Sequence, residues 1–299
     1  MANVNIQELL DNGVHFGHLT RKWNPNMAPY IYTERNGVHI IDLYKTAAKI
    51  EETSEALKKI ANSGRKILFV ATKKQAKDIV AEKAKAINMP YITERWPGGM
   101  LTNFVTIRKA VKKMAHIDRM KLDGSFDALS KREKLQINRQ REKLEKNLGS
   151  ISDMTRLPGA LFIVDIKKEH IAVAEAQKLN IPIFAMVDTN SDPRLVDFVI
   201  PANDDASKSI DKVLSFVIDA VAEGLSERKA DKEKVAPKKE EAKVEAPKAE
   251  TVAPAVEEAK VEEAKVEAPA KEEAPKKAKA PKKAAKKADV AETPAEEKK

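Results

Sequence analysis

The chain has 299 residues, a formal net charge of +9 at pH 7 and no cysteine. The lack of cysteine excludes disulfides, thiolate zinc sites and a cysteine nucleophile, and it fits a reducing compartment. The apolar runs are too short to span a bilayer, and the first residues lack the basic and apolar regions of a signal peptide. We therefore expect a soluble, cytoplasmic protein without membrane association.

The N-terminal segment 15–32 groups cations, aromatic rings and asparagines within eighteen residues. Aromatic side chains interleaved with cations and amides are what stacking and hydrogen bonding to folded RNA require. A histidine in such a loop is more often a packed, hydrogen-bonded residue than a ligand. The RNA-binding candidates in this segment are Arg21, Lys22, Trp23 and Asn24.

Beyond this segment, strand-like and helix-like patterns alternate. Short apolar runs predict strands at 38–42, 66–71, 91–93, 160–165, 183–188 and 198–200, several of them continuous, as in strands covered on both faces. Apolar residues at helical spacing predict helices at 46–62, 73–87, 170–179 and 205–225. The repeated β-α-β units predict a doubly wound α/β domain whose sheet is mostly parallel.

The turn after the second of these strands places Thr72, Lys73 and Lys74 at a helix N-terminus. Backbone N–H groups at such a terminus favour an anion. Because the Gly-rich phosphate-binding motifs are missing, this turn suits a phosphate of a nucleic-acid backbone better than a nucleotide. We therefore add these three residues to the RNA-binding candidates.

Residues 95–108 join two cations, an indole, a Gly-Gly pair and small polar side chains, with no acid among them. Such a loop can bring its backbone close to a phosphate, and a solvated loop around a buried Trp is the alternative. The candidates for RNA contact are Arg95, Asn103 and Arg108, whereas Trp96 is expected to anchor the loop by packing.

Residues 105–148 contain no strand pattern. Two apolar stripes at helical spacing, separated by the turn signal Asp123-Gly124, predict an antiparallel helical hairpin, a short coiled coil. The segment holds 13 Lys and Arg against 6 acids, a net charge of +7. Concentrated positive charge attracts a polyanion, so Lys109, Lys112 and Lys113 join the RNA-binding candidates. A protein-binding hairpin and a solvated helical surface remain alternatives.

Acidic residues lie at or just past the predicted strand ends, where ligands bind in open α/β sheets. Carboxylates gathered there can hold Mg²⁺, and His18 can join them in a transition-metal site. The same residue types are also ordinary helix caps and turns. The metal candidates are His18, Asp188, Asp204 and Asp205. The alternative function is a metal-dependent phosphoryl-transfer enzyme that uses Asp165, Asp188 and Asp204.

The last 71 residues, 229–299, differ in composition from the rest. They contain no Phe, Trp or Tyr, and they repeat Lys, Glu, Ala, Val and Pro. Such a segment buries too little apolar surface to offset the entropy of ordering its backbone. We predict an α/β domain formed by 1–104 and 149–228, the inserted hairpin 105–148, and a disordered tail over 229–299.

Seven motifs occur in a fixed order within residues 1–228, and together they resemble the bacterial form of the small-subunit ribosomal protein S2 family. They are Gly13–His18, Trp23–Met27, Gly37–Leu43, Phe69–Ala76, Arg95–Phe104, Val187–Pro193 and Ile200–Ala206. The resemblance implies a flavodoxin-like α/β domain with an inserted helical hairpin. It also implies a structural role without enzymatic activity.

The partners that the resemblance implies are 16S ribosomal RNA and neighbouring small-subunit proteins. One of these is ribosomal protein S1, which captures messenger RNA. No cofactor is required, although the residues leave room for a structural divalent metal ion. We therefore expect a constituent of the small ribosomal subunit that binds its RNA and helps to seat S1 during translation.

Overall fold

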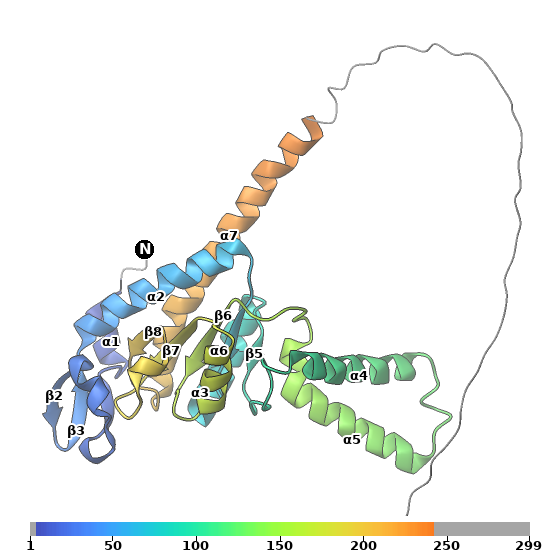
Figure 1. Ribbon diagram of the computed structural model, residues 1–299, viewed down its shortest axis with the longest axis horizontal. Coiled ribbons are helices and arrows are strands. Elements are labelled where there is room, and N and C mark those ends of the chain that lie inside the picture. Colours follow the sequence, from blue (N-terminus) through green and yellow to red (C-terminus); the bar gives the residue numbers. More distant parts are fainter. Residues whose placement is uncertain (1–3, 242–299) are drawn as a thin grey trace, which may run out of the picture. The chain divides into compact units, whose positions relative to one another are not determined.

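The computed structural model describes residues 4–241, with side chains described to residue 231. The contacts between residues divide the chain into two units, residues 1–246 and residues 247–299. The second unit lies outside the described part. Figure 1 shows a central sheet with helices packed against it, a small N-terminal sheet and a helical hairpin. Within the described residues, no helix combines the length and apolarity that crossing a membrane requires.

Five parallel strands form the central sheet in the order β5-β4-β6-β7-β8, which is that of flavodoxin-like folds. This confirms the predicted doubly wound α/β class. Every residue of β4, β6 and β7 is buried, which explains why these strands appear in the sequence as continuous apolar runs. The strands are β4 Ile67–Val70, β5 Tyr91–Ile92, β6 Ala160–Val164, β7 Ile183–Val187 and β8 Phe198–Pro201.

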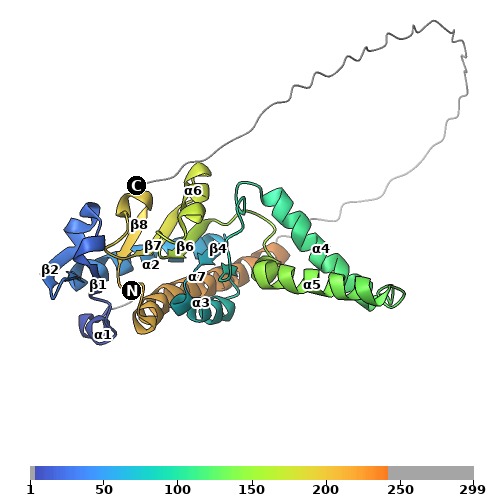
Figure 2. The same ribbon diagram turned by 90° about the horizontal axis from the view of Figure 1, so that it is seen from below.

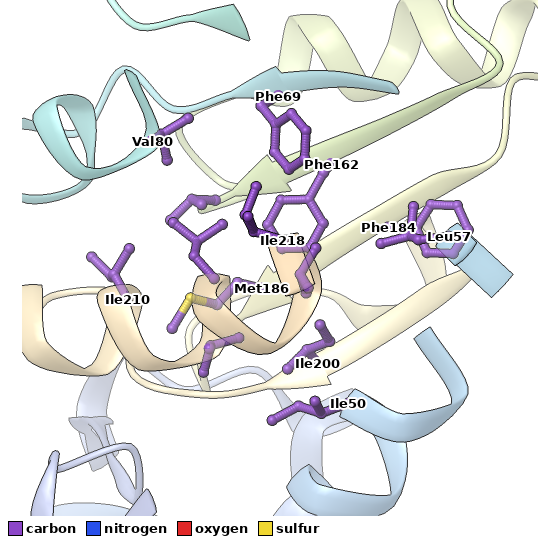
Figure 3. Packing of buried hydrophobic residues seen from close by; sticks show 14 of the residues in the cluster. Ile50, Leu57, Phe69, Val80, Phe162, Phe184, Met186, Ile200, Ile210 and Ile218 are labelled. Atoms are coloured by element: carbon purple, nitrogen blue, oxygen red, sulfur yellow. The ribbon is translucent and has the colours of Figure 1, made fainter. Parts of the chain in front are cut away.

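One face of the sheet is covered by α2 (Leu43–Ser63), α3 (Lys74–Ala86) and α7 (Ser207–Glu241). α2 packs along α7, as Figure 1 and Figure 2 both show. Figure 3 shows Phe162 of β6 and Ile218 of α7 among the buried side chains on this face. These side chains belong to one continuous apolar core.

The other face is covered by α6 (His170–Lys178), by the loop after β5 and by the base of the hairpin. Strand β6 divides its side chains between the two cores: Phe162 lies in the first, and Leu161 and Ile163 lie in the second. This division follows from the two-residue period of a strand.

The hairpin consists of α4 (Phe104–Leu122) and α5 (Lys131–Leu148), as predicted, and it ends in the short 3-10 turn η3 (Gly149–Ile151). A capping box begins α5: the Ser130 hydroxyl accepts from the backbone of Glu133, whose carboxylate accepts from Ser130. In Figure 2, α4 and α5 extend away from the sheet.

A second, antiparallel sheet in the order β1-β3-β2 precedes α2. The sequence predicted only β3, and not as part of a separate sheet. The pairings of β3 with β1 and with β2 both contain register shifts, and β2 is mostly exposed. The sequence here therefore lacks the regular apolar-polar alternation by which a strand is predicted. The remaining elements here are α1 Ile6–Asp11, β1 Phe16–Leu19, η1 Thr20–Lys22, η2 Pro25–Tyr30, β2 Ile31–Arg35 and β3 Val38–Ile41.

The last helix is longer than expected. α7 runs to Glu241, so the helix end predicted at 225 and the start of disorder predicted at 229 are both too early. Residues 226–241 are rich in Lys, Glu and Ala, which have high helix propensity, and they continue a helix already anchored in the core. The disorder predicted for 242–299 concerns residues outside the described part.

Candidate nucleic-acid interface

One buried carboxylate, Glu175 of α6, organises the loop between β5 and α4. It accepts hydrogen bonds from Trp96 Nε1 at 3.1 Å and from the backbone N–H groups of Gly99, Leu101 and Thr102 at 2.8, 2.9 and 3.1 Å. Burial by itself raises the pKa of Glu175, but these hydrogen bonds outweigh burial and hold the pKa below its ordinary value. The loop is therefore built around an internal anion.

This arrangement decides between the two interpretations of the loop. Trp96 is only 6% exposed and anchors the loop by packing, as expected from its sequence context. Gly99 has φ of 82°, a left-handed conformation that favours glycine. Because Glu175 occupies the N–H groups of the loop, they are not open to a phosphate. Sequence reasoning missed Glu175, since no motif marks it and it lies on a distant helix.

Positively charged side chains are exposed around this loop. Arg95 and four residues on the first half of α4 are exposed, and among the described residues none of the five has an ion-pair partner. The spacing of the four helical residues places them on one side of α4, because residues four apart are neighbours on a helix. We call them the α4 cation stripe: Arg108, Lys109, Lys112 and Lys113.

Two other cations of the hairpin form ion pairs within it. Arg141 pairs with Asp118 across the two helices and with Glu145 at 2.6 Å, and Lys134 lies 3.5 Å from Asp127. Exposed cations without an ion-pair partner among the described residues also occur toward the tip, namely Arg119, Lys121, Lys131, Arg132 and Arg139. Asn103, just before α4, is exposed, and its Oδ1 accepts from the Thr106 hydroxyl at 2.8 Å.

In the N-terminal segment, Arg21, Lys22 and Trp23 are exposed. The Trp23 ring packs at a tilt against His39, with centroids 5.1 Å apart, which leaves one part of the indole accessible. Asn24 is half-buried, and its Oδ1 caps η2 by accepting from the backbone of Asn26 at 2.9 Å. Asn24 thus has a local structural role, while its three neighbours remain available.

The turn after β4 is engaged inside the protein. The Thr72 backbone N–H donates to Glu169 Oε1 at 3.0 Å, and the Thr72 hydroxyl donates to the same oxygen. Burial raises the pKa of Glu169, and the hydrogen bonds from Thr72 oppose this increase. The helix terminus expected to receive a phosphate therefore already has an internal carboxylate beside it.

Lys73 is buried as well. Its Nζ lies 2.8 Å from Asp204 Oδ1 and 2.6 Å from Asp205 Oδ1. Together with the Thr72 contacts, this pairing corrects the expectation that the turn offers an open phosphate site, because its lysine neutralises strand-end acids. Of the three residues predicted there, only Lys74 is exposed.

The strand-end acids do meet, as predicted from the topology. His18 Nδ1 lies 2.9 Å from Asp188 Oδ2, and His18 Nε2 lies 3.3 Å from Asp205 Oδ2. One ligand atom each from His18, Asp188 and Asp204 can be chosen so that all lie within 4.8 Å of one another. This set of side chains can hold a proton or a cation.

The protonation of this cluster follows from its burial. Burial and repulsion by Asp188 and Asp165 raise the pKa of Asp204 to about 7, although Lys73 opposes the shift. The hydrogen bond with Asp188 raises the pKa of His18. Asp204 Oδ2 is buried and has no hydrogen-bond partner among the described residues.

The chain belongs to the ribosomal protein S2 family, whose model matches residues 9–224. It is 77% identical over 251 residues to the small ribosomal subunit protein uS2 of Flavobacterium johnsoniae, covering 84% of this chain and 96% of that one. Identity to uS2 of Parabacteroides distasonis is 65% over 250 residues, covering 84% and 88%. Identity to uS2 of Bacteroides thetaiotaomicron is 67% over 232 residues, covering 78% and 84%.

These relatives confirm the family resemblance found in the seven motifs. They also decide against the phosphoryl-transfer alternative, because the family consists of ribosomal structural proteins and not of enzymes. The strand-end acids are therefore interpreted as part of the fold of a ribosomal protein.

Proposed function

We propose that this protein, as a structural constituent of the small ribosomal subunit in the cytoplasm, binds 16S ribosomal RNA through the α4 cation stripe. Arg95, Asn103 and Lys74 extend the proposed interface near the hairpin base, and Arg21, Lys22 and Trp23 form a second contact region. Membership of the S2 family supports the ribosomal role in translation. The RNA contacts are inferred from the charge of the exposed residues.

The observation that carries the proposal is that the four stripe residues are exposed and have no ion-pair partner within the part of the chain that the structure describes. Lysine and arginine without an intramolecular partner release counterions when they neutralise phosphates, which drives binding. Such contacts position a protein on RNA, while Trp and Asn side chains add preference for a site. The stripe therefore has the chemistry of a backbone-binding surface.

The test compares two variants of the same hairpin. Replacing Arg108, Lys109, Lys112 and Lys113 with alanine should weaken binding to 16S RNA and reduce the slope of log K against log salt by about one for each lost contact. The control removes four exposed cations from α5: Lys131, Arg132, Arg139 and Lys143. Equal losses in the two variants, or an unchanged slope in the first, would contradict the interface.

We also propose that the chain helps to seat ribosomal protein S1 through its N-terminal sheet. Phe16, Leu19 and Tyr32 are 49%, 51% and 76% exposed on β1 and β2, and exposed apolar groups of this kind suit a protein partner. Alanine at Phe16 and Tyr32 should weaken binding of purified S1 to the full chain. Alanine at the exposed hairpin residues Leu122 and Leu135 should leave it unchanged.

A structural divalent ion at His18, Asp188 and Asp204 is a further proposal. A nitrogen donor with two carboxylates suits zinc or manganese. Asp204 Oδ2, which has no hydrogen-bond partner among the described residues, can serve as a ligand of the ion. The Lys73 ammonium group competes with the ion for the negative charge of Asp204. Added Zn²⁺ should raise the Tm of the protein, and Asp188→Asn should abolish this increase. His116→Ala, on the exposed face of α4, is the control. An equal increase in both variants would contradict the site.

A further inference from the structure

A cavity of about 540 Å³ lies where the hairpin joins the sheet. Its walls are the start of the edge strand β5, the end of α3 with the turn after it, and η3 with the loop that follows. Figure 1 shows β5 on the side of the sheet that faces the hairpin. Pockets for small ligands typically enclose about 300–1,000 Å³, so this cavity is large enough for a ligand and not only for an ion.

The lining of this cavity carries more positive than negative charge. Lys66, just before β4, and Lys85, in the last turn of α3, are exposed and have no ion-pair partner among the described residues. Lys66 Nζ donates to the backbone carbonyl of Asn88 at 2.6 Å, and Lys85 Nζ lies 5.8 Å from the centroid of the Tyr91 ring. Among the described residues of the lining, the one acid is Asp153. The two ammonium groups therefore favour an anion in the cavity.

Other groups of the lining suit a nucleobase. The side-chain amide of Asn88 is exposed and makes no hydrogen bond within the described part of the chain, and an amide can donate to and accept from the edge of a base. Met89, Tyr91 and Met154 add an aromatic ring and two thioether side chains to the same lining. An acidic peptide would use only the two lysines, whereas a nucleotide uses phosphate, edge and face contacts together. The composition of the lining therefore favours a nucleotide.

A second, smaller hollow connects this cavity with the α4 cation stripe. It encloses about 110 Å³, and Arg108 and Lys112 of the stripe line it together with apolar residues of the same helix. The two hollows share Ser152 and Met154 in their linings, so they adjoin each other. An RNA strand that contacts the stripe is therefore within reach of the cavity.

We propose that this cavity receives one unpaired nucleotide of the RNA that binds the α4 cation stripe. The inference rests on the proposed RNA interface and adds to it a site for a single nucleotide. Lys66 and Lys85 pair with the phosphate of that nucleotide. Its base packs against Tyr91 and Met154, and the Asn88 amide forms hydrogen bonds with the base edge. A base that is stacked and paired within a duplex cannot enter, so the cavity selects a bulge, a loop or a single strand.

Acetylation of lysines in the full-length protein, measured by mass spectrometry, tests the site directly. A lysine that contacts RNA is shielded from the reagent. With 16S RNA bound, Lys66 and Lys85 should react several-fold more slowly than in the free protein. Lys59 on α2 and Lys178 on α6, which are exposed and lie outside the lining, should react at an unchanged rate. Unchanged reactivity of Lys66 and Lys85 would overturn the proposal.

The lysines of the α4 cation stripe separate this inference from the proposed function in the same measurement. Protection of Lys109, Lys112 and Lys113 without protection of Lys66 and Lys85 would overturn the cavity site and leave the α4 interface intact. A lack of protection in both groups would contradict the RNA interface itself and the cavity site with it. Protection of both groups is the expected result.

Two short RNAs of one sequence distinguish an inserted nucleotide from a phosphate backbone on the surface. The single strand should protect the stripe lysines and also Lys66 and Lys85, whereas the fully paired duplex should protect the stripe lysines alone. Equal protection of Lys66 and Lys85 by the duplex would assign them to a backbone contact. Equal protection by polyglutamate would assign the cavity to an acidic protein. Either of these results would overturn the proposal.

Substitution of the two lysines provides the second arm. Lys66→Ala with Lys85→Ala should weaken binding of the single strand and reduce the slope of log K against log salt by about 1.4, because each phosphate contact on a single strand contributes about 0.7. Lys85→Ala alone, which removes no hydrogen bond of the fold, should reduce the slope by about half as much. The control Lys59→Ala with Lys178→Ala removes the same charge outside the cavity. Equal losses in the two double variants would contradict the site.

Discussion

At the scale of single residues, Glu175 connects the body of the protein to the α4 cation stripe. Its carboxylate accepts hydrogen bonds from four N–H groups of the loop that leads into α4, at distances between 2.8 and 3.1 Å. A carboxylate with several N–H partners is favoured in its charged form even when it is buried. The position of the proposed RNA-binding surface thus depends on a residue that does not contact RNA.

Glu175→Gln should destabilise the protein by about 1–3 kcal/mol, because the amide N–H₂ group cannot accept from the loop N–H groups. In a Trp23→Phe background, Trp96 is the one indole of the chain. In the Glu175→Gln variant, the fluorescence of Trp96 should shift toward that of an exposed indole. Urea unfolding measures the stability, and Glu82→Gln, an exposed change on α3, is the control. An unshifted spectrum would contradict the anchoring role.

The same residue predicts a pH dependence. The pKa of Glu175 is lower in the folded state than in the unfolded chain, so the folded state binds fewer protons. Its contribution to stability is fully present above about pH 4.3, the ordinary pKa of glutamate, and is lost as the pH falls through the folded value. The stability gap between wild type and Glu175→Gln should therefore be largest near pH 7 and should shrink in acid. A stability difference between the two proteins that widens in acid would contradict the predicted direction of this pH dependence.

At the scale of elements, the hairpin is held by a narrow apolar seam with a polar defect. Ile117, in the outer half of α4, and Leu148, at the base of α5, are buried, whereas the other seam residues of the two helices are half-buried. Asn138 of α5 places its Oδ1 in the seam without a hydrogen-bond partner among the described residues. A polar group in a helical seam costs stability and specifies register. We therefore expect the hairpin to open more readily than the sheet.

Replacing Asn138 with leucine should stabilise the hairpin by about 1 kcal/mol, because the unpaired carbonyl is replaced by an apolar group. Hydrogen exchange of the α4 and α5 amides should slow, while exchange in β6 and β7 stays the same. Gln136→Leu, on an exposed position of α5, serves as the control. Faster exchange in the Asn138 variant would show that the asparagine has a partner that stabilises the helix pair.

At the scale of the whole molecule, two apolar cores on opposite faces of one sheet hold the fold together. Phe162 lies in the central strand β6, is fully buried and has its ring centroid 5.6 Å from that of Phe69. Phe162→Ala should cost about 3–5 kcal/mol through the lost contacts and the cavity. Urea unfolding followed by circular dichroism tests this value. The exposed Val105→Ala on α4 should change stability little.

The sequence by itself determined the doubly wound class, the hairpin and the family. These three conclusions depend on local periodicity and on the order of motifs, both of which can be observed within single segments of the sequence. For example, β4, β6 and β7 appear as continuous apolar runs because both of their faces are buried. It also placed the strand-end acids together, because parallel strands end at one edge. The N-terminal sheet escaped prediction, since its bulged, exposed strands lack alternation.

Only the tertiary structure decided which polar groups are available. Thr72 and Lys73 have the residue types of a phosphate site, yet Glu169 and Asp204 occupy them inside the fold. The loop after β5 has the composition of a phosphate-binding loop, yet its N–H groups belong to Glu175. Such partners are distant along the chain, so no local pattern reveals whether a charge is already paired. Free energy of binding depends on that pairing, which folding alone establishes.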